Sequence, residues 1–406
     1  PQAFDYIADF VEDIACDKIV EDMEAQVVAR VLDTESQASG NQIKIQSVIE
    51  LLPRSLESCT NDFLVAADGA LTQKTTQVAQ QFVAKINDNM QIEDALETGM
   101  TVDEVLLFDC RALLAEAEMS KGDIVASGRC SCEIVYVSGG KIFNQNMCLP
   151  FVRTLGEGGA HTRASVDVAV KESKLVIEGT DKENVLRAEV TLQFCGNIFE
   201  TQEVELVEDI FCPTQNLSVD RKNIAFELVE PIVEVEEKIS GSVESDNKDC
   251  VIKKVVAQSI VQSSVDNVFV DNGVVVCEGL VVAAIMFEDD EEKLNCMQIE
   301  LPYSLQSKQE NDLISGNLVG QCLVCDLSTK IKRGKEVELD ATILISIFHN
   351  SPRNLCGIVA VEEGEEIKQK RCGISILIPK SGQTMWDVAK QLAMPIEEIK
   401  MQNQGI

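Results

Sequence analysis

The amino-acid sequence predicts a mainly β protein, in which tandem antiparallel β-domains (each a sandwich or an open barrel) precede a small βαα(β) domain. Three observations indicate this fold. Apolar and polar residues alternate at period two over many stretches, as a half-buried strand requires. Aromatic residues make up only 4% of the chain, so Val, Ile, Leu and Ala must fill the cores, and β-branched residues favour strands. The alternating pattern also returns at the length of a domain.

Length and charge limit the classes of function. At 406 residues the chain is long enough for roughly two to four domains. Its formal charge of −33 repels phosphates and anionic lipids, so we expect neither nucleic acid nor a membrane surface as a partner. The sequence shows no apolar run long enough to span a membrane and no signal peptide. The acidity either keeps a long β protein soluble or recruits a basic protein surface.

An internal repeat organises the chain. Alternating strands centred on Ile45, Leu186 and Leu339 align with offsets of 141 and 153 residues (186 − 45 and 339 − 186). A second pair of anchors, Gly128 and Gly279, lies 151 residues apart (279 − 128). Independent anchors with nearly equal offsets indicate a duplicated β-domain rather than a short solenoid repeat.

The repeat predicts four segments. Residues 1–71 form the downstream part of a first unit, residues 72–218 a second, residues 219–370 a third, and residues 373–406 the small C-terminal domain. The first unit lacks its upstream half, because Phe4 to Phe10 already matches the end of that half. Together with the absence of an initial methionine, this indicates a fragment of a longer polypeptide.

Each complete unit begins with a hairpin. Gly122 to Phe151 and Gly273 to Tyr303 both show two alternating runs around a turn, at Ser138-Gly139-Gly140 and at Glu288-Asp289-Asp290. A second strand pair follows, such as Ala164 to Val170 and Leu175 to Phe199.

The segments between the units are acidic and mixed in pattern. We expect Leu71 to Leu107 and Leu217 to Val251 to be structured connectors, because Gly and Pro are sparse there. Within the first, Ile92 to Glu97 fits a short helix or a strand equally well.

The pattern changes at the C-terminal end. Ile374 to Ile378 reads as a strand, and a Gly-containing turn follows it. Met385 to Leu392 has helical spacing, with Thr384 placed to cap its first turn. Pro395 opens a second short helix.

This C-terminal segment resembles the LysM domain, and the matching residues are Lys380, Gly382, Gln383, Thr384, Met385, Trp386, Ala389, Ile399 and Asn403. Two departures are that Gln383 replaces the usual Asp and that the chain stops at Ile406, before the closing strand of the family. LysM domains bind N-acetylglucosamine polymers such as peptidoglycan. The resemblance implies a groove for a glycan or a protein partner, lined by Gly382, Gln383, Thr384, Met385, Met394, Pro395 and Ile396. The alternative for Met385 and Trp386 is that they only fill a small core.

Duplicated β-units ahead of a LysM domain resemble the SPOCS domain architecture of clostridial coat-morphogenesis proteins. The features that match are Asp123 to Gly128 with Leu149 to Phe151, and Gly273 to Gly279 with Leu301 to Tyr303. The resemblance implies a scaffold in the mother-cell cytoplasm, at the forespore surface or in the spore coat. It also implies a partner, either the coat-basement ATPase (stage IV sporulation protein A-like) or another coat protein.

The sequence argues against catalysis, cofactors and metals. Its two histidines, His161 in a turn and His349 at a strand end, lie in different repeats and are expected to be solvated. Neither a phosphate-binding loop nor a nucleophile elbow is present. The acidic runs at 289–292 and 362–366 lack the alternating ligand spacing of a calcium loop and are expected to be solvated turns.

The fifteen cysteines are odd in number and irregularly spaced. Most lie within apolar alternation, so we interpret them as small buried hydrophobes in a reducing compartment. Cys322 and Cys325 have CxxC spacing, but positions three apart in a strand face opposite sides. Cys130 and Cys132 share a strand face, and two ligands do not make a metal site.

Three functions remain open. The first is a non-enzymatic sporulation scaffold that binds coat proteins and helps to encase the forespore, with exposed β-edges that accept a partner strand. The second is a peptidoglycan-binding wall or spore-surface protein in which the β-domains are spacers. The third is a homo-oligomer that assembles into a fibre or layer and is cross-linked by cysteines, which buried thiols would argue against.

Overall fold

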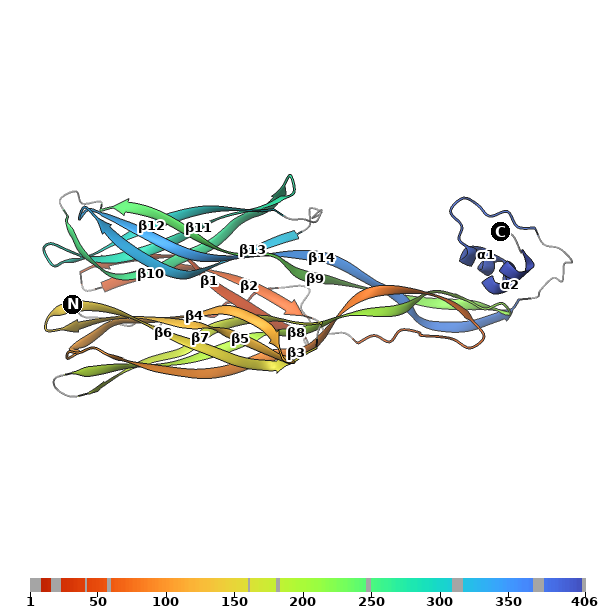
Figure 1. Cartoon of the computed structure of the whole chain (residues 1–406), viewed down its shortest axis with the longest axis horizontal. Helices are drawn as coiled ribbons and strands as arrows, with labels where there is room; N and C mark the ends of the chain where they lie inside the picture. Colours follow the sequence, from red (N-terminus) through yellow and green to blue (C-terminus); the bar gives the residue numbers. More distant parts are fainter. Residues whose placement is uncertain are drawn as a thin grey trace. The chain divides into compact units, whose positions relative to one another are not determined.

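The computed structural model describes residues 9–15, 23–40, 42–56, 60–159, 161–179, 183–245, 250–308, 317–367 and 376–403. Long antiparallel strands dominate these residues, and the two helices that they contain lie near the C-terminus (Figure 1). The prediction of a mainly β protein is therefore confirmed. The segments predicted at 4–8, 374–375 and 404–406 lie outside the described residues.

The first sandwich consists of six strands: β3 (Leu71–Glu97), β4 (Glu104–Ser120), β5 (Asp123–Ser138), β6 (Lys141–Glu157), β7 (Thr162–Gly179) and β8 (Asn184–Phe211). They form two three-stranded sheets, in the orders β4-β5-β6 and β3-β8-β7. One apolar core lies between the sheets. It contains alternate residues of β5, β6 and β8, such as Ile134, Leu149 and Leu192, all at most 2% exposed.

The second sandwich repeats this arrangement with β9 (Gln215–Glu244), β10 (Ile252–Asp271), β11 (Val274–Asp289), β12 (Leu294–Lys308), β13 (Asn317–Lys332) and β14 (Glu336–Glu366). Its sheets have the orders β10-β11-β12 and β13-β14-β9. Ile285, Leu301 and Ile343 are among the side chains buried in its core.

The two sandwiches correspond strand by strand, and a glycine marks the same place in each. Gly128 on β5 faces the ring of Phe151 on β6, and Gly279 on β11 faces the ring of Tyr303 on β12. A β carbon at either glycine would collide with that ring and with a backbone carbonyl oxygen of the neighbouring strand. Only glycine lets the aromatic ring cross the strand there.

The hairpin of β1 (Glu24–Ser39) and β2 (Gln42–Leu56) forms a separate two-stranded sheet. Its side chains are exposed at positions that are buried in the later repeats. Ile45 is 55% exposed, whereas Leu186 and Leu339, which align with it, are 0% exposed. The same alternation therefore forms strands both where the described apolar side chains are buried and where they are exposed.

The chain divides into two compact units, and β3, β8, β9 and β14 contribute residues to both. The first unit comprises Pro1–Ser58, Phe82–Phe199 and Val229–Ser351, and it contains both sandwich cores. The second comprises Cys59–Gln81, Glu200–Leu228 and Pro352–Ile406, and it contains the ends of the four long strands and both helices.

The second unit has apolar packing of its own. Val207, Ile210 and Ile358 form a buried cluster on β8 and β14. The Leu64 N–H donates to the Ile358 carbonyl oxygen at 2.8 Å. The amide of Gln77 on β3 bridges Cys356 on β14, donating to its carbonyl oxygen at 2.9 Å and accepting from its N–H at 3.0 Å. A side-chain amide thus replaces part of a β-ladder between these strands.

The helices follow the predicted positions. α1 (Met385–Leu392) begins after Thr384, whose hydroxyl accepts from the Asp387 N–H while the Asp387 carboxylate accepts from the Thr384 N–H. This capping box satisfies two backbone donors that the helix leaves unpaired. α2 (Ile396–Gln402) begins after Pro395. Both predicted starts are confirmed.

Several other local predictions can be compared with the structure. The turn at Ser138-Gly139-Gly140 is confirmed, since both glycines have positive φ angles. The open question at Ile92 to Glu97 is resolved in favour of a strand, because this segment lies within β3. The predicted connectors are largely the long strands β3 and β9, which start the two sandwiches.

Three boundaries were wrong. β7 continues to Gly179 and β8 begins at Asn184, so the strands do not break between Val170 and Leu175. β14 does not end near His349 but continues through Pro352 to Glu366. Residues 376–378 of the expected strand at 374–378 form no strand, because no described segment pairs with them and an extended segment needs a partner for its backbone groups.

Candidate functional site: the C-terminal two-helix module

The two-helix module, residues 376–403, is held to the strands of the second unit by one carboxylate. Asp209 on β8 accepts a hydrogen bond at 2.9 Å from Trp386 Nε1 on α1. Lys390 Nζ lies 2.7 and 2.8 Å from the two oxygens of the same carboxylate. Arg221 on β9 donates to Asp209 Oδ1 at 2.8 Å. Because the Asp209 side chain is only 19% exposed, these charge-assisted bonds are partly shielded from water.

The donors also set the ionisation of Asp209. Burial alone would raise the pKa of this carboxyl, but hydrogen bonds from Lys390 and Trp386 and the Lys390 charge outweigh burial and hold the pKa below its usual value. The contact therefore stabilises the docked module fully above the ordinary titration range of an aspartate. It is lost as the pH falls through the lowered pKa.

Apolar packing completes the attachment. The rings of Phe211 and Trp386 meet edge to face, with centroids 5.0 Å apart. Val388, Ala389 and Ile399 are buried in the same cluster, and the side chains that pack partly against it are Leu71, Leu377, Trp386, Leu392, Met394 and Ile396. Trp386 therefore fills a core, as the alternative interpretation expected, and it also donates a specific hydrogen bond.

The first half of the predicted groove remains exposed. Gly382 has a φ of +88°, and the Gln383 N–H donates to the Lys380 carbonyl oxygen at 3.1 Å. Gln383 Oε1 accepts from the Lys380 N–H at 2.8 Å, so the side chain that replaces the usual Asp of LysM domains closes the turn. Met385 is 41% exposed and lies outside the helix cluster. The turn from Gly382 to Met385 is thus ordered by hydrogen bonds while its surface is free.

The second half of the predicted groove is partly used for packing. Met394 and Ile396 are half-buried and contact the helix cluster, and Pro395 precedes the first residue of α2. Ala393 takes a left-handed conformation with φ +48°, and the Met394 N–H donates to the Ala389 carbonyl oxygen at 3.0 Å. Met394 and Ile396 consequently offer less surface to a partner than the turn does.

The module begins with an apolar segment that sequence reasoning did not assign to the site. Ile376 and Ile378 are 87% and 84% exposed, while Leu377 between them packs against the helix cluster. The segment belongs to no strand. The sequence signal for this segment was its run of apolar residues. In a strand-like pattern such residues point alternately to opposite sides, which leaves every second one exposed when only one side is covered.

The histidines lie where no catalytic arrangement is evident. His161 is exposed in the turn before β7. His349 Nδ1 lies 3.0 Å from the hydroxyl of Ser351, two residues along β14. Ser351 is only 7% exposed, so its hydroxyl is poorly placed to reach a substrate.

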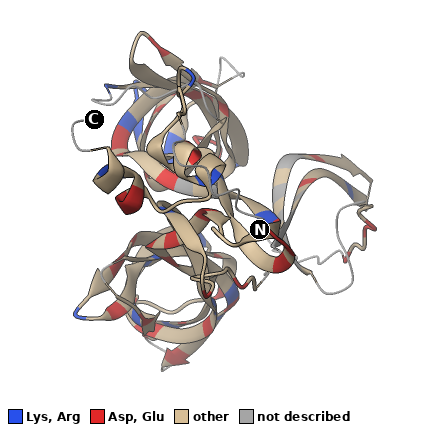
Figure 2. Ribbon diagram, turned by 90° about the vertical axis from the view of Figure 1, so that its right-hand side faces the viewer, with Lys and Arg blue, Asp and Glu red and all other residues tan. Residues whose placement is uncertain are grey.

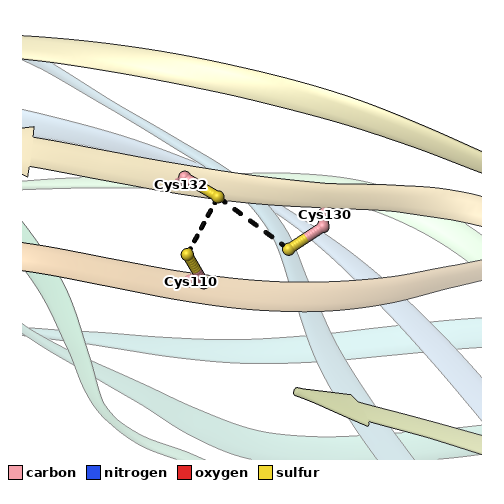
Figure 3. A group of neighbouring side chains, drawn as sticks. All are labelled: Cys110, Cys130 and Cys132. Atoms are coloured by element: carbon pink, nitrogen blue, oxygen red, sulfur yellow. Dashed lines mark hydrogen bonds between the residues drawn. The ribbon is translucent and has the colours of Figure 1, made fainter. Parts of the chain in front are cut away.

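Three thiols converge inside the first sandwich. Cys110 on β4 and Cys132 on β5 are register partners with Sγ atoms 2.9 Å apart, and Cys130 Sγ lies 4.0 Å from Cys132 Sγ. Figure 3 shows the three sulfurs turned towards one another from two neighbouring strands. Hydrogen bonds with Cys110 and Cys132 lower the pKa of Cys130, and hydrogen bonds with Cys110 and Cys130 raise the pKa of Cys132. The sequence placed only Cys130 and Cys132 on one face, because the strand register decides where Cys110 lies.

No family model, curated protein or solved structure matches this chain. Among the described residues, neither α1 nor α2 is long and apolar enough to cross a membrane.

Proposed function

We propose that this protein is a non-enzymatic scaffold that binds partner proteins through the two-helix module and assembles with them at a spore surface. The observation that carries the proposal is that some side chains of the module fix it to the strands while others stay exposed. Trp386 contacts Asp209 and Phe211, whereas Met385, Ile376 and Ile378 are exposed. An exposed and partly apolar surface whose turn is ordered by hydrogen bonds is suited to binding a partner.

The sporulation role rests on the resemblance to SPOCS and LysM domains. It makes the coat-basement ATPase, or another coat protein at the forespore surface, the first partner to test. The charge of the chain supports a protein partner with a basic surface. Figure 2 shows Asp and Glu spread over many strands, so acidic surface is widely available for steering such a partner.

The test measures binding of the chain to purified coat-basement ATPase by biolayer interferometry, and to purified peptidoglycan by sedimentation. Met385→Glu should weaken ATPase binding at least tenfold without lowering Tm, because Met385 is 41% exposed in the turn. Met401→Glu is the matched control, since Met401 on α2 is 67% exposed and lies outside the predicted groove.

Two outcomes would count against the proposal. Equal ATPase binding by the wild-type chain and Met385→Glu would place the interface elsewhere. Binding to peptidoglycan that Met385→Glu abolishes, without binding to the ATPase, would favour the wall-anchor alternative.

Fixation of the module can be tested separately. Asp209→Ala removes the acceptor shared by Trp386, Lys390 and Arg221, and should destabilise the docked helices by about 1.5–3 kcal/mol, the usual range for hydrogen bonds to a charged group. Hydrogen exchange of peptides from α1 and α2 measures this change. Unaltered protection in both helices would show that Asp209 does not hold the module.

A further inference from the structure

The thiol cluster of the first sandwich, Cys110, Cys130 and Cys132, has the geometry of a ligand set. All three Sγ atoms lie within 4.8 Å of one another, and no histidine or carboxylate of the described residues belongs to the group. Three sulfurs around one metal ion at about 2.3 Å would be about 4 Å apart, which small side-chain rotations from the observed 2.9 and 4.0 Å can reach. The site is therefore assembled before any ion arrives.

The repeat shows that the fold itself does not require sulfur at these positions. The second sandwich has Ile260, Val281 and Ala283 where the first has Cys110, Cys130 and Cys132, and these aliphatic residues pack in its core. The neighbouring strand gives the same result, because Met147 pairs with Cys132 and Ile299 pairs with Ala283. Four sulfur side chains in one sandwich thus replace four aliphatic side chains in the other. The need to fill a core can explain a single buried cysteine. It does not explain why three cysteines face one another.

The surroundings favour a soft ion over a hard one. Directly opposed residues in a sheet have Cβ atoms about 5 Å apart, so Met147 brings a thioether close to Cys132. Thiolates and thioethers select Cu(I) among the common biological metals, whereas Ca²⁺ and Mg²⁺ require oxygen ligands. Zn²⁺ prefers four ligands in a closed tetrahedral site, and the cluster supplies three thiols. Cys110 is only partly buried, which provides an entry path from solvent.

We propose that Cys110, Cys130 and Cys132 bind a single Cu(I) ion in a trigonal thiolate site inside the first sandwich. Each thiol that coordinates the ion releases its proton to solvent, and copper stays in the +1 state throughout, so no electron is transferred. The ion bridges β4 and β5 and stabilises the sandwich, because a ligand that binds only the folded state raises Tm. This site is independent of the two-helix module and of partner binding.

The experiment titrates the fully reduced chain with Cu(I) under anaerobic conditions, in competition with a chromogenic Cu(I) chelator. The competitor leaves only tight sites visible, which matters in a chain with fifteen cysteines. We expect one tight equivalent per chain, a Tm that rises by several degrees, and an X-ray absorption spectrum with three sulfur neighbours.

Two variants remove the site in different ways. Cys130→Val with Cys132→Ala copies the residues of the second sandwich and should weaken binding at least 100-fold, while the core keeps side chains of suitable size. Cys110→Ser changes the partly exposed ligand alone and should weaken binding at least tenfold. The control is Cys277→Ala with Cys322→Ala, which removes two core thiols of the second sandwich and should leave the tight equivalent unchanged.

Several results would overturn the proposal. One is the absence of a tight Cu(I) equivalent in the reduced wild-type chain. Another is a Cu(I) affinity equal to that of the wild-type chain in both variants, Cys130→Val/Cys132→Ala and Cys110→Ser, while both remain folded. A third is a Cys110–Cys132 disulfide that survives the reduction used for the titration, because that bond would occupy two of the ligands.

Discussion

The two sandwiches share one architecture and differ in how specific positions are filled. Both pack two three-stranded sheets in the same order, and both place an aromatic ring over a glycine, at Gly128 in the first and at Gly279 in the second. Yet one core contains three converging thiols where the other contains Ile260, Val281 and Ala283. The comparison distinguishes the positions at which the fold requires a particular residue from those at which different side chains can fill the core.

What the fold demands is a pattern of size and polarity at inward positions. Residues that alternate at period two and point inward are buried in both sandwiches, and they include aliphatic, aromatic and sulfur-containing side chains. Residue identity is constrained more strongly where a backbone and a ring approach closely, as at the two glycines. The hairpin of β1 and β2 adds a third case, in which the same pattern forms strands whose apolar side chains stay exposed.

The largest expected effect comes from removing the same core side chain in each repeat. Leu186→Ala and Leu339→Ala should each cost about 2–5 kcal/mol, because both side chains are fully buried and leave a cavity. Ile45→Ala, at the aligned position of the hairpin, should change stability by less than about 0.5 kcal/mol, because Ile45 is 55% exposed. Urea unfolding of the three variants measures this. A cost above 2 kcal/mol for Ile45→Ala would show that the hairpin is covered in solution.

The next effect concerns the two glycines. Gly128→Ala and Gly279→Ala should each cost about 3 kcal/mol, because the added carbon meets an aromatic ring and a carbonyl oxygen that belongs to the backbone. Ser127→Ala and Glu278→Ala are neighbouring controls on the same strands and should be nearly neutral. Thermal unfolding would contradict the equivalence of the sandwiches if one glycine tolerated alanine and the other did not.

A smaller effect distinguishes the two rings. Tyr303 donates a hydrogen bond to the Ser264 carbonyl oxygen at 2.8 Å, and Phe151 in the first sandwich has no hydroxyl to donate. Tyr303→Phe should therefore cost about 1 kcal/mol. Phe151→Tyr should change stability by less than about 1 kcal/mol, since its hydroxyl would lie near the Leu113 carbonyl oxygen. A large loss in Phe151→Tyr, measured by urea unfolding, would mean that the first core has no space for the oxygen.

Much of the fold could be predicted because strand formation depends on local alternation. The turn at Gly139-Gly140, the capped helix after Thr384 and the repeat anchored at Gly128 and Gly279 all have short-range signals. Strand lengths could not be predicted. β3 spans 27 residues and β14 spans 31, several times the usual strand length of about 5–6 residues, so each crosses expected boundaries.

The candidate sites were less accessible to sequence reasoning, because each depends on contacts between distant segments. Asp209 meets Trp386 across 177 residues, and no local pattern marks an isolated aspartate as a docking point. The thiol cluster requires the register of β4 on β5, which irregularities at Val105/Leu107 and Leu114/Glu116 shift. Cys110 pairs with Cys132, and Cys130 lies two residues from Cys132 on the same face of β5. With that register known, the sequence would have been enough to find the cluster.

The smallest predicted effect is a pH dependence of stability. It arises at one aligned position, where the second sandwich has an ionisable residue and the first has an apolar one. Val137 is the next-to-last residue of β5, and Glu288 takes its place on β11, where it pairs with Lys253 and Lys254 at 3.0 Å. Hydrogen bonds from Lys254 and Lys253 hold the pKa of Glu288 below its usual value. A lowered folded-state pKa means that the ion pairs stabilise the sandwich fully above the unfolded pKa. That stabilisation is lost as the pH falls through the folded pKa.

Glu288→Gln should consequently lower Tm at pH 7, and its difference from the wild-type chain should vanish as the pH falls through the lowered pKa of Glu288. Glu278→Gln, an exposed carboxylate on the same strand, is the matched control and should show no such convergence. Val137→Glu makes the reciprocal change, and it should be destabilising because Glu104, rather than a lysine, lies opposite Val137 in the register. A constant difference between Glu288→Gln and the wild-type chain from pH 7 to pH 3 would mean that shape, rather than charge, makes this position differ between the two sandwiches.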